Sequence, residues 1–569
     1  MNRAAKWLCK CQDTHHCNIS APHNETAPRW PRRLLELCRD SETVTLILTK
    51  EGFNPPYATL SYCWGPNGLP HTAKTTVNNI SARQAHIDER SLPRTFQDAI
   101  RVCHQLEIQY LWIDALCIVQ DSKADWQSEG SNMGSIYRNS TITIAADSSE
   151  DAEGGLFYHL DSSDLEVKFT VRLSDGSDAK LTLHPTSITS LKPKISILKT
   201  RAWCFQERVL SPRILHFFDC GVLFECRQGY YLYNDPRLSA PAGSISPTGS
   251  RIGKGLGCSS EEYLSFLQDE LMIDYHGTYP PMADHELRFY QAATKGFANA
   301  LSPYVLLRPW FHTVLKDYTT RRLTFESDKL MAISSVAREI QHQTGATYLA
   351  GLWAEAIAYG LAWESSGGHV VSNDNDTPDM ESAKRPSWSW ISSDAGCNWP
   401  IYESGFEWWY PHLHQTFKSH IALLSHQVEL ISPDPFGQVS GGRLEVRGKA
   451  FRGSYIPSGK PGTSGTFDIY INLWTGEFLG FLGVCTSFGN EDDVRIVQWE
   501  SAMPMNRLCL LLCSKGTERF FLELKKVEEP NVYERKDMFV VDHKAGGSFA
   551  YEEFMEFVEY GEEYNLILV

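Results

Sequence analysis

The sequence predicts an α/β core with a mainly parallel β-sheet, followed by a helical region and a β-rich C-terminal domain. Three observations support this prediction. Apolar runs that suit buried strands alternate with amphipathic helical patterns from residue 57 to residue 146. Helical spacing of apolar residues dominates residues 283–365, and short alternating segments that suit half-buried strands follow residue 394. Strands and helices that alternate with short connections favour a parallel sheet with helices on its faces.

A loop separates the first strand of the core from its first helix. Residues 57–63, YATLSYC, are largely apolar and end at the turn sequence WGP, which predicts a buried strand stopped by a turn. Residues 92–106, LPRTFQDAIRVCHQL, carry apolar side chains at helical spacing. Thr95 with Asp98 three residues later predicts a helix cap, so we expect this helix to begin after Thr95.

A strand, a helix and a third strand complete the alternating pattern. Residues 110–119, YLWIDALCIV, are almost continuously apolar, which predicts a strand in a sheet covered on both faces. Ser122 and Asp125 form a second capping pattern, and the helix that follows turns Trp126 toward the core. Residues 141–146, TITIAA, predict the third strand.

The rest of the chain divides by composition and pattern. A helix at residues 201–213 and a strand pair at RILHFF and GVLFEC close the core, and a segment rich in Gly, Ser and Pro follows. The expected parts are an N-terminal Cys/His-containing segment at 1–40, an α/β domain at 41–234, a linker or surface loop at 235–260, a helical region at 261–400 and a β-rich domain at 401–569.

Composition and charge exclude several classes of function. Lys and Arg number 53 against 69 Asp and Glu, and the net charge of −16 opposes general binding to nucleic acid or anionic lipid. The chain has 15 cysteines, an odd number, and some of them lie in apolar segments such as LCLLLC. Both observations favour buried thiols over a disulfide framework. Because no signal-peptide pattern and no apolar stretch of membrane-spanning length is present, we expect a soluble cytoplasmic protein.

Glu207 lies in the segment RAWCFQERVLSPR, between a tryptophan and several arginines. Its neighbours three and four positions away on a helix are Trp203, Cys204, Leu210 and Ser211. None of these neighbours is basic, so an intrahelical ion pair has no partner. A carboxylate that shares its face with an indole suits a site that binds a flat ring and raises the pKa of the acid. The structural alternative is a tertiary salt bridge with Arg201 or Arg213.

Two other acids and a cysteine-rich segment carry candidate chemistry. Asp114 interrupts an apolar run, so it either anchors a structural network, the favoured interpretation, or faces a pocket at the sheet edge. Glu129 lacks a basic helical neighbour, and a structural network is favoured there too. The N-terminal segment contains Cys9, Cys11, His15, His16 and Cys17. No second ligand pair at zinc-finger spacing follows, so packed thiols are favoured and no metal site is predicted.

Five ordered segments resemble the signature blocks of the fungal heterokaryon incompatibility (HET) domain. These segments are YATLSYCWG, LPRTFQDAIRVC, YLWIDALCIVQD, DWQSEGSNMGSIYRNSTITIAA and RAWCFQERVLSPRILHF. The resemblance covers residues 57–217, and the segment with Cys11, His16 and Cys17 resembles the usual surroundings of that domain. It implies a protein of fungal nonself recognition whose activation brings cell death, with a second copy or another incompatibility protein as partner. Cys204 departs from the family pattern, which has threonine there.

HET domains in turn resemble TIR domains, which are doubly wound α/β modules, and some TIR domains cleave NAD. The segment WCFQE, which ends at Glu207, is similar to the Trp-Cys-x-x-Glu segment whose glutamate carries that activity. The resemblance implies a TIR/flavodoxin-like fold and an NAD glycohydrolase in which NAD is the substrate and no metal or other cofactor is used.

The same resemblance implies roles for individual residues around NAD. Glu207 would stabilise the oxocarbenium-like ribose, because nicotinamide leaves as a neutral amide and needs no general acid. The residues expected to bind the substrate are Trp64, Gly65, Asp114, Arg201 and Trp203. One of the two indoles would stack on the base, and Asp114 or Arg201 would orient the ribose or the phosphates. The loop that contains the glycine follows the first strand, where open α/β sheets bind ligands.

Three functions remain open on the sequence. The first is a cell-death effector that hydrolyses NAD when its regulatory regions are relieved or assembled. The second is a noncatalytic signalling module in which the same fold oligomerises and recruits a partner. The third is a small-molecule biosynthetic enzyme built on the same domain.

Overall fold

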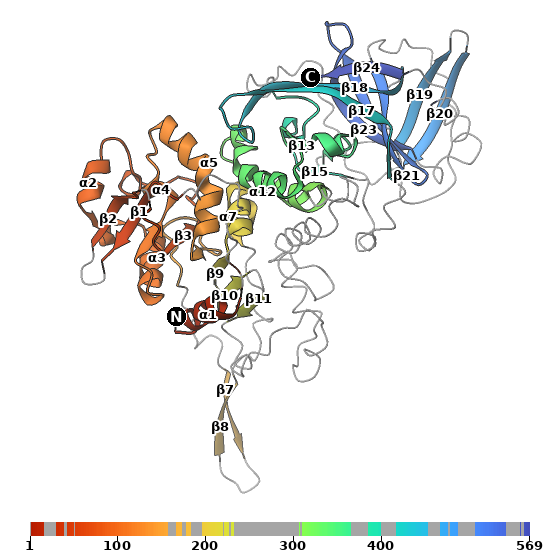
Figure 1. Ribbon diagram of the computed structural model, residues 1–569. Helices are drawn as coiled ribbons and strands as arrows, with labels where there is room; N and C mark the ends of the chain where they lie inside the picture. The colour runs from red at the N-terminus through yellow and green to blue at the C-terminus, as the bar shows by residue number, and fades with distance from the viewer. Residues whose placement is uncertain are drawn as a thin grey trace. The chain divides into compact units, whose positions relative to one another are not determined.

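The structure of the chain, a computed structural model, contains two compact units (Figure 1). The first comprises Met1–Phe289 with Ala332–Val336, and the second comprises Tyr290–Met331 with Ala337–Val569. The structure describes residues 2–15, 17, 30–38, 43–50, 52–157, 167–172, 178–183, 196–219, 221–226, 229–232, 307, 310–365, 385–399, 417–452, 467–475, 478–486, 507–541, 558 and 563–569. The predicted linker at 235–260 lies outside the described residues.

A nine-stranded mixed sheet organises the first unit, with the order β11-β10-β9-β6-β3-β5-β1-β2-β4. Its strands are β1 (Arg33–Leu37), β2 (Thr43–Leu48), β3 (Tyr57–Ser61), β4 (Ile87–Asp88), β5 (Tyr110–Trp112), β6 (Ile142–Ala145), β9 (Arg213–Phe218), β10 (Gly221–Cys226) and β11 (Gly229–Leu232). Strands β9, β6, β3 and β5 are parallel, whereas the strands on either side of these four pair antiparallel.

The prediction of a mainly parallel sheet is therefore correct for the centre of the sheet only, and the sheet as a whole is mixed. Strands β2, β10 and β11 each begin no more than six positions after the last residue of the preceding strand, at Leu37/Thr43, Phe218/Gly221 and Cys226/Gly229. A short loop joins antiparallel strands, because a parallel pair needs a crossover of a dozen or more residues. The outer strands are consequently antiparallel.

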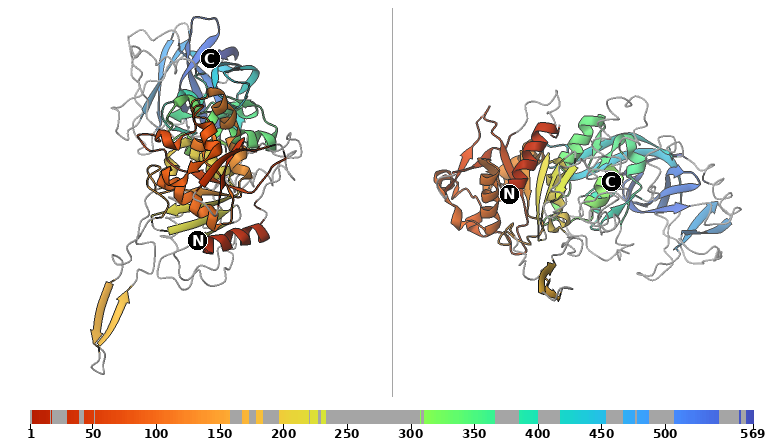
Figure 2. Two further views of the ribbon diagram at one scale, coloured as in Figure 1. Left: turned by 90° about the vertical axis from the view of Figure 1, so that its left-hand side faces the viewer. Right: turned by 90° about the horizontal axis from the view of Figure 1, so that it is seen from below.

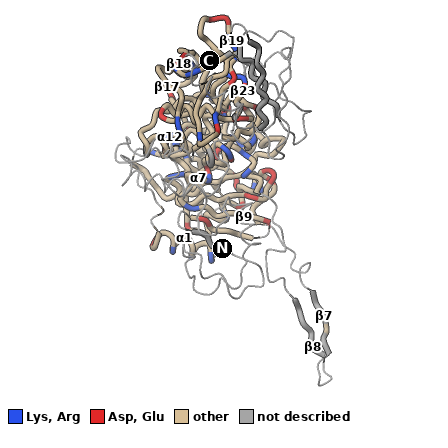
Figure 3. The backbone as a smooth tube through the Cα atoms, turned by 90° about the vertical axis from the view of Figure 1, so that its right-hand side faces the viewer, with Lys and Arg blue, Asp and Glu red and all other residues tan. Residues whose placement is uncertain are grey.

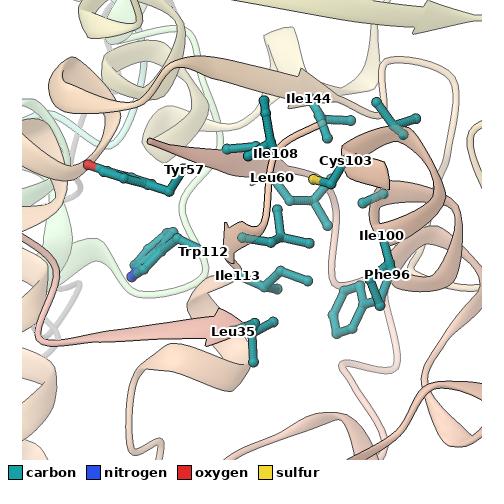
Figure 4. Close-up of a cluster of buried hydrophobic side chains, with 14 of the residues drawn as sticks. Leu35, Tyr57, Leu60, Phe96, Ile100, Cys103, Ile108, Trp112, Ile113 and Ile144 are labelled. Carbon is teal, nitrogen blue, oxygen red and sulfur yellow. The ribbon is translucent and has the colours of Figure 1, made fainter. Parts of the chain in front are cut away.

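Helices cover both faces of the parallel strands. The helices are α3 (Arg94–Gln105), α5 (Lys123–Asn139) and α7 (Ala202–Leu210). In Figure 4, side chains of α3, among them Ile100, pack toward Leu60 of β3. On the opposite face, the hydroxyl of Tyr57 donates to the carbonyl of Ile136 in α5 at 2.6 Å. Because alternate residues of a strand share a face, Ser61 also lies on the face that α5 covers.

The predicted strand at residues 110–119 is wrong beyond Trp112. β5 ends there, and Asp114–Cys117 forms the short helix α4. The Asp114 carboxylate accepts from the Ala115 backbone N–H at 2.6 Å, a local bond that favours a turn over an extended strand. Continuous apolar sequence fits a buried helical turn as well as a buried strand, so the pattern alone does not separate the two.

One of the two predicted helix starts is confirmed. Ser122 caps α5, and its hydroxyl accepts from the Asp125 N–H at 3.3 Å. Helix α3 begins at Arg94, so the predicted cap at Thr95 is wrong. The Thr95 hydroxyl instead accepts from the Gly155 N–H at 3.0 Å and holds a loop that follows β6.

The first unit also uses residues that precede the expected α/β domain at 41–234. β1 lies inside the sheet, where it pairs with β2 on one side and β5 on the other. Helix α1 (Asn2–Thr14) packs on β10 through Trp7 and Phe224, whose ring centroids are 6.3 Å apart. Figure 2 shows α1, in dark red, beside the yellow strands at this edge of the sheet. Residues before 41 therefore contribute a helix and an internal strand to this unit.

The second unit confirms the predicted β-rich C-terminal region. Its main sheet has seven strands in the order β16-β21-β22-β23-β24-β18-β17. These strands are β16 (Phe417–Ser419), β17 (Ile421–Leu430), β18 (Val439–Arg452), β21 (Arg507–Lys515), β22 (Glu518–Lys526), β23 (Val532–Val541) and β24 (Glu563–Leu568). All neighbouring pairs are antiparallel except β23 with β24.

Within the described residues 310–365, one segment of the predicted helical region is extended and not helical. α12 (Ser334–Thr344) is helical, but the segment YLAGLW forms a hairpin of β12 (Tyr348–Leu349) and β13 (Leu352–Trp353). Ala350 and Gly351 have φ angles of 43° and 96°. Positive φ values at successive residues interrupt a right-handed helix and are typical of a tight hairpin turn.

Charged residues of both signs are interspersed along the described part of the chain, as the blue and red segments of Figure 3 show. The net charge of the full sequence is −16. Among the described helices, none combines the length and the apolar character that a membrane span needs.

Candidate functional site

The candidate site lies at the carboxyl ends of the neighbouring parallel strands β3 and β5. The half-buried Asp114 follows β5. Its Oδ1 accepts from the Tyr62 hydroxyl at 2.8 Å, and its Oδ2 accepts from the Trp64 indole N–H at 3.0 Å. Burial raises the pKa of Asp114, although these hydrogen bonds favour the ionised form. Tyr62 and Trp64 follow β3, so Asp114 joins two strand ends at the edge where open α/β sheets bind ligands.

Glu207 reaches the same edge from helix α7. Its Oε2 accepts from the hydroxyl of Ser61, the last residue of β3, at 2.5 Å. Glu207 is 7% exposed. Burial raises the pKa of Glu207 to about 7, although the Ser61 hydroxyl and the charge of Arg201 favour the ionised form. A carboxyl group with this pKa gains or loses its proton near neutral pH, as acids and bases in catalytic sites do.

Arg201 precedes α7 and brings a guanidinium group to the end of β3. Its Nη1 donates to the backbone carbonyl of Tyr62 at 2.5 Å. Burial raises the pKa of Glu207 and of Asp114, and the positive charge of Arg201 lowers both values. Arg201 therefore favours the ionised form of both carboxyl groups. Arg213, the other arginine considered as a partner of Glu207, donates through Nε to the Sγ atom of Cys11 at 3.1 Å.

The two tryptophans of the predicted site have different surroundings. Trp64 hydrogen-bonds to Asp114, and the Nζ atom of Lys74 lies over its ring, 5.5 Å from the centroid. Trp203 packs edge-on against Trp126 of α5, with ring centroids 6.1 Å apart. Trp64 therefore belongs to the polar site, whereas Trp203 contributes to the packing of α7 on α5.

Gly65 shapes the loop that follows β3. Its φ of 83° lies in the left-handed region, which glycine adopts without strain. Its carbonyl accepts from the Gly68 N–H at 3.1 Å, which closes a turn. A Cβ atom at this position would lie 2.6 Å from the Cβ of Asp151. The contribution of Gly65 to the site is thus the path of the backbone beside Trp64.

Hydrogen bonds link most of the predicted site residues through two residues that the sequence argument missed. The predicted residues that come together are Trp64, Asp114, Arg201 and Glu207. Ser61 and Tyr62 connect them, because Ser61 binds Glu207 while Tyr62 contacts both Asp114 and Arg201. Their position in the sequence could have indicated both residues, because polar groups at the carboxyl end of a buried parallel strand lie at the ligand-binding edge of the sheet.

A second polar network lies beside the carboxyl end of β6. His216 in β9 contacts Asp147 through Nδ1 and Glu225 through Nε2, both at 2.9 Å. Arg208 of α7 donates to Glu225 at 3.1 Å. Burial disfavours the charged imidazolium, but the two carboxylates outweigh burial and raise the pKa of His216 to about 9. This charged network ties α7, which carries Glu207, to the sheet.

Glu129 occupies a different environment from the site. It is buried in α5, and its Oε2 accepts from the backbone N–H of Arg32 at 3.4 Å. Burial raises the pKa of Glu129 to about 7, as it does for Glu207, while the charges of Arg33 and Arg32 act against this rise. Glu129 therefore matches Glu207 in burial and pKa but takes part in the contacts around β1.

One set of ligand-type side chains comes together outside these networks. The ligand atoms of Cys11, His15, Cys17 and Cys226 all lie within 4.8 Å of one another. For the N-terminal members of this set the sequence predicts packed thiols and no metal site, because no second ligand pair follows at zinc-finger spacing. Cys226 of β10 is the fourth ligand-type residue of the set. It lies 211 residues from His15 along the chain, so no short sequence motif contains both residues.

Residues 57–207 match the family model described as heterokaryon incompatibility protein (HET). The matched segment begins at the first residue of β3 and ends at Glu207, so it contains every member of the site at the ends of β3 and β5. No curated protein and no solved structure is significantly similar to the chain.

Proposed function

Because residues 57–207 of this chain are a heterokaryon incompatibility (HET) domain, we propose that the protein is a fungal nonself-recognition and cell-death effector that hydrolyses NAD in the cytoplasm. The observation that carries the proposal is the buried Glu207 carboxyl group, with a pKa raised to about 7 by burial, at the ends of β3 and β5. Self-association or another incompatibility protein supplies the activating contact.

The order of the parallel strands supports a TIR/flavodoxin-like core. Numbered along the chain, β3, β5, β6 and β9 are arranged 2-1-3-4. Flavodoxin-like sheets have the order 2-1-3-4-5 and bind ligands at the carboxyl ends of the strands where the order reverses. In this chain the reversal lies between β3 and β6, and Ser61 ends β3 there. Glu207, bonded to Ser61, therefore stands where such a sheet would hold a nucleotide.

A single carboxylate is sufficient for the proposed reaction. Nicotinamide departs from a cationic pyridinium as a neutral amide, so the leaving group needs no proton. Positive charge grows on the ribose as the C–N bond breaks, and an anionic Glu207 beside the anomeric carbon would stabilise it. Water then adds to the ribose and releases a proton, which gives ADP-ribose.

The other site residues receive binding roles in this proposal. Arg201 would contact a phosphate or ribose oxygen, because its guanidinium lies at the end of β3 and carries several donors. Asp114 would accept from a ribose hydroxyl after exchange of one of its present donors. Trp64 would stack on the nicotinamide once Lys74 moves from its ring. Trp203 would act indirectly, by packing α7 against α5.

Activation has to expose Glu207, which is 7% exposed in this structure. A nucleotide cannot place its anomeric carbon beside a carboxylate that is covered by protein. The proposed enzyme is therefore at rest in this conformation, and assembly or relief of regulatory regions opens the site. Such control suits an enzyme whose activity leads to cell death.

A noncatalytic signalling module is the second candidate, and one observation favours it. The Ser61–Glu207 hydrogen bond is buried, as expected of a polar pair that holds a helix on a sheet. In that case the domain acts by recruiting a partner, and the raised pKa of Glu207 is a consequence of burial alone.

NAD cleavage by the full chain tests the proposal. Nicotinamide release is measured over a wide range of protein concentration for wild type, Glu207→Gln and Glu129→Gln. Loss of release in Glu207→Gln, with release and thermal stability retained in Glu129→Gln, supports the enzyme. A wild-type chain that is inactive at every concentration, yet still self-associates, supports the signalling module.

A further inference from the structure

Three cysteines and one histidine converge where helix α1 meets the sheet edge. Cys11 lies in the last turn of α1, and the backbone N–H of His15 donates to its carbonyl at 3.0 Å, so the two side chains leave the same face. Cys17 follows two residues later. Cys226 ends β10, and its Sγ lies 3.3 Å from the Nδ1 atom of His15. All three cysteines are at most 2% exposed.

The spacing of these atoms fits a tetrahedral metal site. All four ligand atoms lie within 4.8 Å of one another. A tetrahedral zinc ion with Zn–S bonds of about 2.3 Å places its sulfur ligands about 3.8 Å apart. Three thiolates with one imidazole form a frequent ligand set of structural zinc, in which protein fills all four positions.

The neighbouring charge also fits a zinc–thiolate centre. Three thiolates and one Zn²⁺ ion leave a net charge of −1. Arg213, which is 2% exposed, donates through Nε to the Sγ atom of Cys11 at 3.1 Å. Arg213 lies in β9 directly opposite Cys226 of β10. A buried guanidinium beside the sulfur ligands balances this charge and orients one of them.

We propose that Cys11, His15, Cys17 and Cys226 bind one structural Zn²⁺ ion that fastens helix α1 to strand β10. Two of these ligands lie in the last turn of α1 and just after it, and Cys226 lies on the strand that α1 covers through Trp7 and Phe224. Binding requires that the three thiols lose their protons to solvent and that His15 binds through neutral Nδ1.

A disulfide is the competing chemistry for three adjacent thiols. It would join only two of the three cysteines and would leave the third thiol and His15 without a shared function. The zinc site uses all four side chains. The two alternatives also differ in mass, since a disulfide removes two hydrogens from the chain and blocks two thiols from alkylation under denaturing conditions.

Metal analysis of the untagged full chain, purified without chelators and with a reductant, tests the proposal. We expect about one zinc per chain. Zinc-edge X-ray absorption should show a first shell of three sulfurs and one nitrogen. Replacement by Co²⁺ should give the intense thiolate-to-cobalt and ligand-field bands of a tetrahedral site. A wild-type chain that holds no zinc and develops no cobalt bands, or one in which two of these cysteines are joined, overturns the proposal.

Variants at Cys226 and at Cys9 test the ligand assignment. Cys226→Ser should lower zinc content and cobalt absorbance at least tenfold at equal free metal. Cys9→Ser is the matched control, because Cys9 is exposed on α1 and lies outside the cluster, so it should retain both signals. Equal zinc in the two variants contradicts the assignment. If Cys226→Ser does not fold, the sulfur count of the wild-type absorption spectrum decides, and a first shell without sulfur rejects the site.

Discussion

Opposing effects act on the Glu207 carboxyl group, and their balance sets its chemistry. Burial favours the protonated form and raises the pKa of Glu207 to about 7, while the Ser61 hydroxyl and Arg201 favour the carboxylate. Only the carboxylate can stabilise positive charge on ribose. The proposed activity should therefore rise with pH, because loss of the Glu207 proton supplies the carboxylate.

Ser61→Ala tests which contact sets that pKa. The substitution removes the hydroxyl that donates to Glu207 at 2.5 Å. A hydrogen bond to a charged group is worth about 1.5 kcal/mol or more, so the ascending limb of the pH–rate profile should move up by about one pH unit. A profile that does not move would show that another group controls the activity. Thr59→Ala, on the same face of β3, is the control for altered packing.

Trp126→Ala tests the extent of burial on α5. Trp126 is half-buried and packs edge-on against Trp203, whereas Trp112 is fully buried. Replacing a fully buried tryptophan by alanine lowers the free energy of unfolding by about 3 to 5 kcal/mol. We expect a loss in that range for Trp112→Ala and a loss of about 2 kcal/mol for Trp126→Ala. Denaturant midpoints measure both. Equal losses would contradict the difference in burial.

Residue chemistry was predictable where it depended on neighbours along the helix. The absence of basic residues three and four positions from Glu207 indicated an unusual acid, and its burial and raised pKa agree with that expectation. The Ser61 contact was not predictable, because a tertiary hydrogen bond leaves no spacing in the sequence. The same holds for Cys226 and His15, which are 211 residues apart.

At the scale of elements, a charged network holds α7 against the sheet. Folding raises the pKa of His216 from an ordinary value of about 6.5 to about 9, because Asp147 and Glu225 outweigh burial. A raised pKa in the folded state adds stability that is complete below about pH 6.5 and is lost as pH rises through about 9.

His216→Gln measures this contribution. Wild type should lose on the order of 2 to 3 kcal/mol of unfolding free energy between about pH 6.5 and about pH 10 because of this group, and the variant should lose correspondingly less. Denaturant unfolding at a series of pH values, with metal supplied in excess, gives the comparison. Identical pH dependence in the two proteins would show that His216 is not protonated in the folded state.

Element types were predicted best where the apolar period was unambiguous. The strands at 57–63 and 141–146 and the helix that Ser122 caps are present as expected. The continuous run at 110–119 divided into β5 and α4, because a local bond from Asp114 turns the chain. YLAGLW became a hairpin because positive φ values at its centre are compatible with a turn, which apolar spacing does not reveal.

At the scale of the molecule, the first unit depends on residues that its family model does not cover. β1 pairs with both β2 and β5, so its removal would expose an edge of β5 inside the sheet. A fragment of residues 40–235 should therefore be unfolded or aggregated, whereas residues 1–235 should fold. Amide exchange or NMR dispersion distinguishes them, and a folded 40–235 fragment would refute the requirement for α1 and β1.

The coarse architecture was predictable from alternating patterns, because strands joined by helical crossovers form a parallel sheet. The β-rich C-terminal sheet was predictable for the same kind of reason, since period-two alternation indicates half-buried strands. The insertion of β1 into the centre of the sheet was not, because the order of strands depends on packing between distant segments. The strand order makes β3 and β5 neighbours, so the residues of the candidate site lie together at their carboxyl ends.

The central claim is that the Glu207 carboxylate cleaves NAD, and the ratio of nicotinamide release by wild type and Glu207→Gln tests it most directly. Both proteins are assayed as full chains at about pH 8, above the pKa of about 7 that burial gives Glu207, with melting temperatures measured on the same samples. We predict that Glu207→Gln melts within a few degrees of wild type and releases nicotinamide at least about a hundredfold more slowly. A folded variant that matches the wild-type rate would contradict the claim.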